Sequence, residues 1–172
     1  MKRYYVDLEL NVKKFGITKK NDMIDYLFKV IHGLLRSESE TKIGLSFPKF
    51  SASKDDRFPT LGRVFRLVSN DYEALRNFVS KNSIDNLLVS EIILIGDISE
   101  VPREYVSEYV FKRHHPNPQN KASTDECAYV NLEKNGNKYR FYIKRTKIDK
   151  IENSLFTSYG LGNYNGPSVP IF

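Results

Sequence analysis

Residues 3–10 read RYYVDLEL, and in this run apolar and polar side chains alternate with a period of two residues. Such alternation predicts a β-strand that buries one face. Residues 19–37, KKNDMIDYLFKVIHGLLRS, follow, and their apolar side chains recur three and four positions apart. This spacing predicts an amphipathic helix, which we expect to be capped near Asn21 or Asp22.

The segments that follow extend this pattern. A second helix is expected at residues 70–83, NDYEALRNFVSKNS, which begin with the cap residues Asn70 and Asp71. Three further strands are expected at residues 42–48, 63–69 and 90–98. The order strand, helix, strand, strand, helix, strand is that of the split βαβ, or ferredoxin-like, plan. We therefore predict a ferredoxin-like (βαββαβ) domain over residues 1–98.

The second half of the chain has a different character. Residues 105–124 begin as a strand and continue as a polar loop broken by prolines. Residues 128–148, AYVNLEKNGNKYRFYIKRTKI, predict two strands joined at Asn135 and Gly136, because both central positions of a type I′ turn need a positive φ. The sequence thus predicts an α+β fold in which a smaller β-rich domain, residues 99–172, follows the ferredoxin-like domain.

Basic residues are concentrated in one window of the chain. The formal net charge is +6 and the isoelectric point is near 9.3. Residues 134–150 hold seven Lys or Arg against one acid, Asp149. Such a concentration points to an anionic partner such as a nucleic acid. A solvated basic edge strand is the alternative.

No segment of the sequence predicts membrane, disulfide or metal chemistry. The chain has no run of 18 or more apolar residues. Its first residues read as a strand and not as the apolar core of a signal peptide. The single cysteine, Cys127, cannot pair within the chain, and no residues of zinc-ligand spacing accompany it. We therefore expect no metal, no membrane contact and a reducing, cytoplasmic location.

His32 is the histidine best placed for catalysis. At about 100° per residue, it lies roughly 40° beyond the apolar arc of its helix, at the border with charged side chains. There the ring can be packed on one side while its nitrogens face a cleft, as a general base near neutral pH requires. A boundary histidine held only for packing is the alternative.

His114 and His115 stand in a basic stretch, FKRHHPNP. The adjacent cations Lys112 and Arg113 disfavour a divalent metal ion. Nucleic-acid contact and a solvated loop are both compatible with this stretch. The sequence has no phosphate-binding loop, zinc-protease motif or nucleophile elbow, so any catalysis has to come from single residues brought together in space.

Several stretches of the chain, in the same order, resemble the CRISPR repeat-processing endoribonucleases of the type I-F system. They are YYVDLEL (4–10), LFKVIHGLL (27–35), KIGLSFPKF (42–50), LGRVFRL (61–67), VPREYVSEYVFKRH (101–114), YRFYIKR (139–145) and, in the tail, SYGLGN with PSVPIF (158–172). The combination of IGLSFP, SYGL and a preceding helical histidine is the most specific part of this resemblance.

The resemblance implies cleavage of a CRISPR repeat RNA at the base of its stem-loop, without metal or cofactor, to leave a 2′,3′-cyclic phosphate. A stem-loop-binding subunit with weak or no cleavage is the alternative. By position, the catalytic histidine of the family falls on His32 and its active-site tyrosine on Tyr159. Two base-reading positions fall on Lys112 and His114, and an aromatic residue that stacks on the terminal base pair falls on Tyr139.

Other basic side chains near these positions are also expected to bind RNA. They are Arg113, His115, Lys138, Arg140, Lys144 and Arg145. The implied partners are the repeat stem-loop, the mature crRNA and the other subunits of a type I-F surveillance complex. The resemblance also implies a monomer that holds one RNA.

Two features depart from the family pattern. The family has a serine near the scissile phosphate in the hairpin, where this chain has Lys134 or Asn135 in a shorter turn. Because lysine can hold a phosphate electrostatically, Lys134 is a third catalytic candidate. Residues 116–127, PNPQNKASTDEC, stand where the family has an arginine-rich helix, and we expect that helix to be missing. RNA affinity would then rest on residues 134–150, with a shallower salt dependence.

The tail of the chain, residues 156–172, is rich in glycine, proline and aromatic residues. On the nuclease hypothesis, the glycines let the backbone approach the RNA closely and the prolines hold the course of the tail, so that Tyr159 reaches the scissile site. A tail that only packs its aromatic side chains is the alternative.

Overall fold

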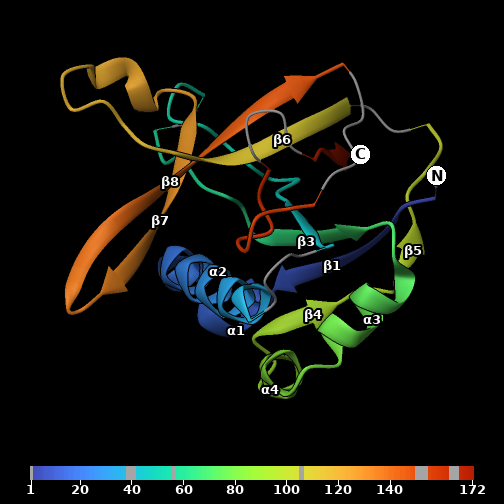
Figure 1. Ribbon diagram of the computed structural model, residues 1–172. Coiled ribbons are helices and arrows are strands. Elements are labelled where there is room, and N and C mark those ends of the chain that lie inside the picture. Colours follow the sequence, from blue (N-terminus) through green and yellow to red (C-terminus); the bar gives the residue numbers. More distant parts are fainter. Residues whose placement is uncertain (1, 38–41, 56, 105–106, 150–154, 163–166) are drawn as a thin grey trace.

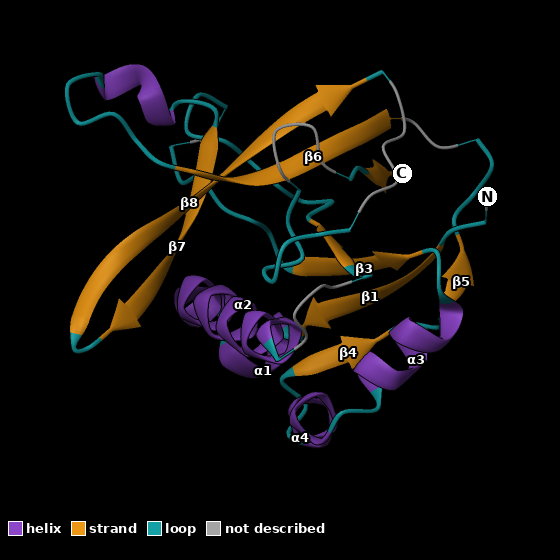
Figure 2. Cartoon of the chain, in the orientation of Figure 1, coloured by secondary structure: helices purple, strands orange, loops and turns teal. Residues whose placement is uncertain are grey.

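The structure is a computed structural model that describes residues 2–37, 42–55, 57–104, 107–149, 155–162 and 167–172 (Figure 1). Two antiparallel sheets and a few helices make up these parts, so the fold is of the α+β class (Figure 2). Lys150 of the basic window and residues 163–166 of the tail lie outside the described residues. Within the described chain, no helix combines the length and apolar character needed to span a bilayer.

The first sheet is built from the N-terminal part of the chain. Its strands are β1 (Tyr4–Leu10), β2 (Gly44–Ser46), β3 (Val64–Ser69), β4 (Ile93–Ile95) and β5 (Ser99–Glu100). They follow the order β2-β3-β1-β4 with every neighbouring pair antiparallel, and β5 pairs with the first residues of β1. Val6, Leu8 and Leu10 of β1 are buried, which confirms the face predicted from the alternation.

In the described part of the chain, four α-helices accompany this sheet. They are α1 (Val12–Phe15), α2 (Lys20–Arg36), α3 (Tyr72–Val79) and α4 (Asn82–Val89). The long helix α2 buries Ile24, Leu27, Phe28, Ile31 and Leu35, the apolar face expected from their spacing. Asp71 caps α3 as predicted, since its carboxylate accepts a hydrogen bond of 3.1 Å from the backbone N–H of Ala74.

The predicted cap of α2 is wrong. The helix begins at Lys20, its N-cap is Lys19, and this residue makes no side-chain capping bond. Asn21 and Asp22 instead lie inside the first turn, because a 3₁₀ turn, η1 (Ile17–Lys19), leads directly into the helix. Asp22 still favours the helix there through the positive end of the helix dipole.

The second sheet contains the predicted hairpin. Its strands are β6 (Ser107–His114), β7 (Cys127–Lys134), β8 (Asn137–Ile148) and β9 (Val169–Ile171), in the order β7-β8-β6-β9. Asn135 and Gly136 join β7 to β8 with φ angles of 53° and 78°, which confirms the predicted turn with two positive φ values. The loop before β7 holds only a short 3₁₀ turn, η2 (Lys121–Thr124), so within residues 116–127 there is no α-helix, as expected.

The two sheets share one hydrophobic core. Phe28 of α2 packs on Phe141 of β8 with ring centroids 5.5 Å apart, and Phe47, which follows β2, packs on Phe111 of β6 at 5.1 Å. The buried ion pair between Arg3 and Glu108 also joins the two sheets. Figure 1 shows α2 beside the β7–β8 hairpin, and residues of this helix contact residues of β7.

Candidate functional site

His32 and Tyr159 lie face to face. Their ring centroids are 3.7 Å apart and their planes differ by 4°. Phe28, one helical turn earlier in α2, has its ring centroid 6.4 Å from that of His32. Phe141 of β8 packs on Tyr159 at 5.1 Å. The imidazole of a helix and the phenol of the tail are thus held together by aromatic packing, although they lie 127 positions apart in the sequence.

A tight turn in the tail delivers Tyr159 to this position. The Gly160 carbonyl accepts a hydrogen bond of 2.7 Å from the N–H of Leu45 in β2, and the Gly162 N–H donates one of 2.8 Å to the carbonyl of Phe111 in β6. Gly160 has a φ of 68°, and a Cβ atom there would come within 2.8 Å of the Leu35 side chain. Only glycine fits this turn well, because any other side chain would meet both backbone strain and the packed core.

The surroundings of His32 favour its neutral form. The pKa of the imidazole lies below its ordinary value of 6.5 because burial disfavours the charged ring, while the backbone of Ser158 opposes this effect and the charge of Arg36 adds to it. The Nδ1 atom is buried and has no hydrogen-bond partner within the described part of the chain. A half-buried histidine that is neutral near pH 7 is able to accept a proton.

The ring pair opens on a cleft of about 920 Å³. Residues of α2, the end of β6, the β7–β8 turn and the tail line this cleft. Among the described residues, the charged ones that line it are the cations Lys29, Arg36, Arg113 and Lys134 and one acid, Glu133. The excess of positive charge next to a neutral histidine suits a site for a phosphate-bearing ligand.

A second cavity adjoins the cleft. It has a volume of about 480 Å³ and shares Arg113, Ser158 and Tyr159 with the cleft. Lys112, His114 and His115 also line it, together with Thr157, Leu161 and Gly162. The structure thus brings the four predicted RNA-binding residues at positions 112–115 next to the His32–Tyr159 pair. The Nε2 atom of His114 is buried without a hydrogen-bond partner among the described residues.

The site residues predicted in the β7–β8 hairpin fall into two groups, those that line the cleft and those that do not. Lys134 and Tyr139 line the cleft, opposite His32. The remaining four line neither the cleft nor the second cavity; they are Lys138, Arg140, Lys144 and Arg145.

These four residues differ in what they contact. Lys138 is exposed near the turn. Arg140 lies over the ring of Tyr129 at 4.5 Å, and Lys144 pairs with Glu126 at 2.5 Å. Arg145 lies over Phe50 and Tyr109, at 4.9 and 5.2 Å.

Sequence reasoning missed five further polar residues that line the cleft. They are Lys29, Arg36, Glu133, Asn137 and Ser158. Arg36 could have been found from the sequence, because residues four apart on a helix share a face and His32 was already a candidate. Ser158 and Asn137 carry no comparable pattern, since their places depend on the course of the tail and on the hairpin turn.

Other features of the described residues fit a catalytic role less well. Burial raises the pKa of the Cys127 thiol to about 11, so this side chain is not a nucleophile at neutral pH. The described residues contain no group of three or more His, Cys, Asp or Glu that could hold a metal ion.

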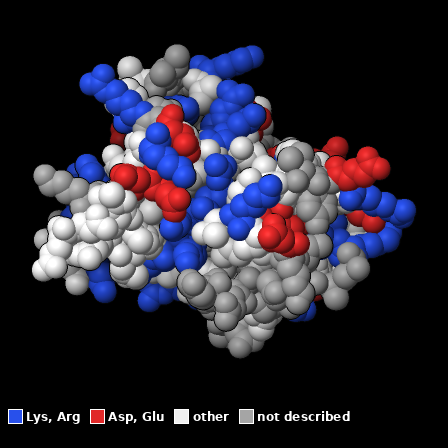
Figure 3. All heavy atoms as spheres, turned by 90° about the horizontal axis from the view of Figure 1, so that it is seen from above, with Lys and Arg blue, Asp and Glu red and all other residues white. Residues whose placement is uncertain are grey.

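Lysine and arginine side chains gather in a band on the face of the molecule seen from above, with acidic groups beside it (Figure 3).

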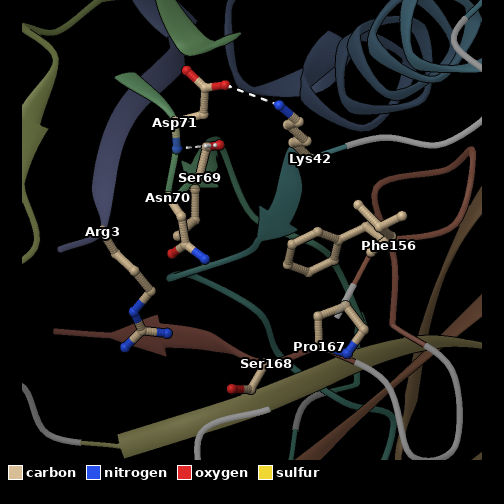
Figure 4. A pocket seen from close by; sticks show the side chains of 10 residues that line it. Arg3, Lys42, Ser69, Asn70, Asp71, Phe156, Pro167 and Ser168 are labelled. Carbon is tan, nitrogen blue, oxygen red and sulfur yellow. Dashed lines mark hydrogen bonds and ion pairs between the residues drawn. The ribbon is translucent and has the colours of Figure 1, made fainter. Parts of the chain in front are cut away.

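A separate cavity of about 340 Å³ is lined on one side by Asn70 and Asp71 and on the other by Phe156 and Pro167 (Figure 4). Its charged groups pair with one another or with neighbouring side chains. Lys42 binds Asp71 at 3.2 Å, and Arg3 binds Glu108. Because these charges are already neutralised by protein groups, this cavity is a weaker candidate for an anionic ligand than the cleft.

A comparison with models of protein families gives a match. The family described as "CRISPR-associated protein (Cas_Csy4)" matches residues 5–127, about seven tenths of the chain. The matched part includes His32 and the stretch from Lys112 to His115, whereas β8 and the tail with Tyr159 lie beyond it. A search of the curated proteins found no match.

Proposed function

Because the chain belongs to the Cas_Csy4 family of type I-F CRISPR repeat-processing proteins, we propose that it is an active endoribonuclease that cuts CRISPR repeat RNA at the base of the stem-loop. The family is one of endoribonucleases that bind this RNA. The observation that carries the proposal for this chain is the His32–Tyr159 ring pair at the edge of a cationic cleft.

The proposed reaction uses the nucleophile that RNA itself carries. His32 takes the proton of a 2′-hydroxyl, the 2′-oxygen bonds to the adjacent phosphorus, and the bond from phosphorus to the 5′-oxygen breaks. The products are a 2′,3′-cyclic phosphate and a 5′-hydroxyl. Tyr159 orients the imidazole through its stacked ring, and Lys134, on the opposite wall of the cleft, attracts the phosphate.

RNA binding in this proposal follows the walls of the two cavities. Lys112, Arg113, His114 and His115 contact the RNA from the end of β6, and the exposed Tyr139 offers a ring on which a base can stack. The exposed Lys138 and the outer residues Arg140, Lys144 and Arg145 add positive charge near the stem. The RNA product remains bound to the protein, which is a monomer that holds one RNA. This protein–RNA complex joins the other subunits of a surveillance complex.

The proposal includes a division of the chain into two domains. Residues 1–98 form a ferredoxin-like domain, and residues 99–172 form the smaller RNA-binding domain. The strand order β2-β3-β1-β4, with α2 between β1 and β2 and α3 between β3 and β4, supports the first part. The separate sheet β7-β8-β6-β9 supports the second.

The test is cleavage of the repeat stem-loop in the presence of EDTA. Wild type should cleave, and His32→Ala should bind the RNA with little change in affinity and lose about 10²-fold or more of the cleavage rate. Arg76→Gln, an exposed cation of α3 that pairs with Glu73, is the matched surface control and should cleave as wild type does. Equal rates for wild type and His32→Ala would overturn the proposal.

A second candidate function is stem-loop binding with feeble or no cleavage. One observation favours it: Lys134 occupies a cleft position near the hairpin turn, and the hairpin strand β8 and the tail lie outside the family match. The same experiment separates the two functions. Tight binding of the stem-loop by wild type with no product in EDTA or in Mg²⁺ would support the binding function.

A further inference from the structure

Cleavage by the proposed route builds up negative charge around one phosphorus atom. While the 2′-oxygen attacks and before the 5′-oxygen leaves, the five-coordinate phosphorus carries more negative charge than the phosphodiester. A cation that contacts the non-bridging oxygens at this moment lowers the barrier. Four cations of the described residues line the cleft: Lys29, Arg36, Arg113 and Lys134.

Arg36 shares the helical face of His32. It lies four residues later in α2, and side chains at this spacing lie one above the other. Because helical side chains lean toward the N-terminus of their helix, the Arg36 side chain leans toward His32, whereas that of Lys29 leans away from it. Arg36 is also the one cation of the described cleft residues whose charge lowers the pKa of His32.

The contacts of the other cleft cations differ from those of Arg36. The side chain of Arg36 is exposed, and no carboxylate of the described residues pairs with it. The guanidinium of Arg113, by contrast, lies 4.9 Å from the ring centroid of Phe141. Lys134 stands on the opposite wall as the last residue of β7. Arg36 therefore combines an open cationic group with a position beside the base.

We propose that Arg36 is a catalytic residue that binds the non-bridging oxygens of the scissile phosphate, an inference that rests on the proposed nuclease function. Its planar guanidinium presents donors in a fork that matches two phosphate oxygens. In the step itself, His32 accepts the proton of the 2′-hydroxyl, and the 5′-oxygen leaves and takes a proton from the protonated imidazole or from water. Arg36 neutralises charge and exchanges no proton.

The first test compares variants under single-turnover conditions with enzyme in excess. Arg36→Gln should lower the cleavage rate about 10²-fold or more, the loss typical of one transition-state donor, while RNA affinity falls far less. Arg36→Lys should keep part of the rate, and Lys29→Gln should lose less than tenfold. Added guanidinium should restore part of the Arg36→Gln rate. A rate of Arg36→Gln within threefold of wild type would overturn the inference.

A pH profile separates a local electrostatic role from a merely structural one. In the cleft, His32 faces the cations Lys29, Arg36, Arg113 and Lys134 and the acid Glu133, with Tyr139 and Tyr159 as further ionisable groups. Removal of the Arg36 charge should move the rise of the rate with pH to higher pH, because that charge lowers the pKa of His32. An unchanged profile in Arg36→Gln would contradict a position beside the base.

A binding measurement tests the inference even if cleavage is absent. Wild type should bind a stem-loop that ends in a 3′-phosphate about tenfold more tightly than the same RNA with a 3′-hydroxyl. Arg36→Gln should lose this preference, and Arg76→Gln should keep it. If wild type fails to cleave but Arg36 still governs the preference, the nuclease function and the catalytic role of Arg36 fail, whereas the binding of a phosphate by Arg36 stands. If Arg36→Gln keeps the preference, the inference about Arg36 fails whatever the cleavage result.

Discussion

The pKa of His32 is the property of a single residue that links the fold most directly to the proposed chemistry. A general base acts in its deprotonated form, so the cleavage rate should rise with pH and level off above the pKa of the base. Because burial lowers the pKa of His32 below 6.5, the midpoint of this rise should lie below pH 6.5. Single-turnover rates between about pH 5 and pH 8 measure it. A midpoint above 6.5 would contradict the role of burial.

Tyr159 contacts His32 through the face of its ring, and this contact predicts how its variants behave. Tyr159→Phe keeps the ring and should cleave within a few-fold of wild type, whereas Tyr159→Ala should lose about 10²-fold, because a catalytic group shifted by about 1 Å loses this much. Single-turnover rates check the effect, and RNA binding by both variants is the control. If Tyr159→Phe is as slow as Tyr159→Ala, the hydroxyl and not the ring face is what matters.

Residue-scale prediction from sequence was strongest where a pattern constrained the side chain. The helical period placed His32 at the border of a buried face, and the structure shows this ring half-buried there, between Phe28 and Tyr159. No period connects His32 with a tyrosine in the tail. That pairing depends on the Gly160 turn and on its bond to β2, which become apparent only when the chain is folded.

At the scale of elements, one pair of hydrogen bonds joins the two walls of the cleft. Asp25 of α2 accepts bonds from the backbone N–H and the side-chain amide of Asn131 in β7, at 3.1 and 2.9 Å. Burial raises the pKa of this carboxyl, which the two bonds lower in part. The contact also pairs an N–H of the edge strand β7, which would otherwise be open to another chain.

Removal of this contact should loosen the hairpin. Asp25→Ala should lower the free energy of unfolding by about 1 kcal/mol, since it removes the acceptor of two hydrogen bonds. Asp25→Asn keeps one acceptor oxygen and should cost less. Urea unfolding of each variant measures the difference, with Asp97→Ala, an exposed acid after β4, as the control. Equal stability of Asp25→Ala and wild type would show that the hairpin is held by its apolar contacts alone.

The prediction of helices and strands failed where the apolar patterns of two neighbouring elements merge and where a strand contains a proline. Residues 82–95 carry apolar side chains so densely that the end of α4 and the start of β4 cannot be separated by period, and α4 was missed. The strand β9 contains Pro170 and was not predicted as a strand. Proline is tolerated there because β9 is an edge strand that pairs only with β6.

At the scale of the whole molecule, fewer basic side chains are open to an anionic ligand than the composition implies. Of the basic residues in the window 134–150, Lys144 is paired with an acid, and Arg140 and Arg145 lie over aromatic rings. Of the described cations that line the cleft, Lys134 belongs to this window, whereas Lys29 and Arg36 come from α2 and Arg113 comes from β6. The number of basic residues along the chain therefore predicts that the partner is anionic, but it does not predict which surface of the protein binds that partner.

This distribution predicts a modest salt dependence of RNA binding. Lys134→Gln and Lys138→Gln should each reduce the slope of log affinity against log salt concentration by about 1, the change expected when one phosphate contact is lost. Arg76→Gln should leave the slope unchanged. Affinities for the stem-loop measured over a range of salt concentrations give these slopes. No change for either lysine would show that the hairpin tip does not touch the phosphate backbone.

The parallel contact between the imidazole and the phenol has a spectroscopic consequence. Protons held over the face of an aromatic ring lie in the shielding cone of its ring current. The carbon-bound protons of His32 should therefore resonate upfield of those of His115, whose exposed ring has no aromatic neighbour among the described residues. The chemical shift of the His32 ring protons therefore reports on this contact. A nucleotide that binds and moves the two rings apart should shift these resonances toward the values of an exposed histidine.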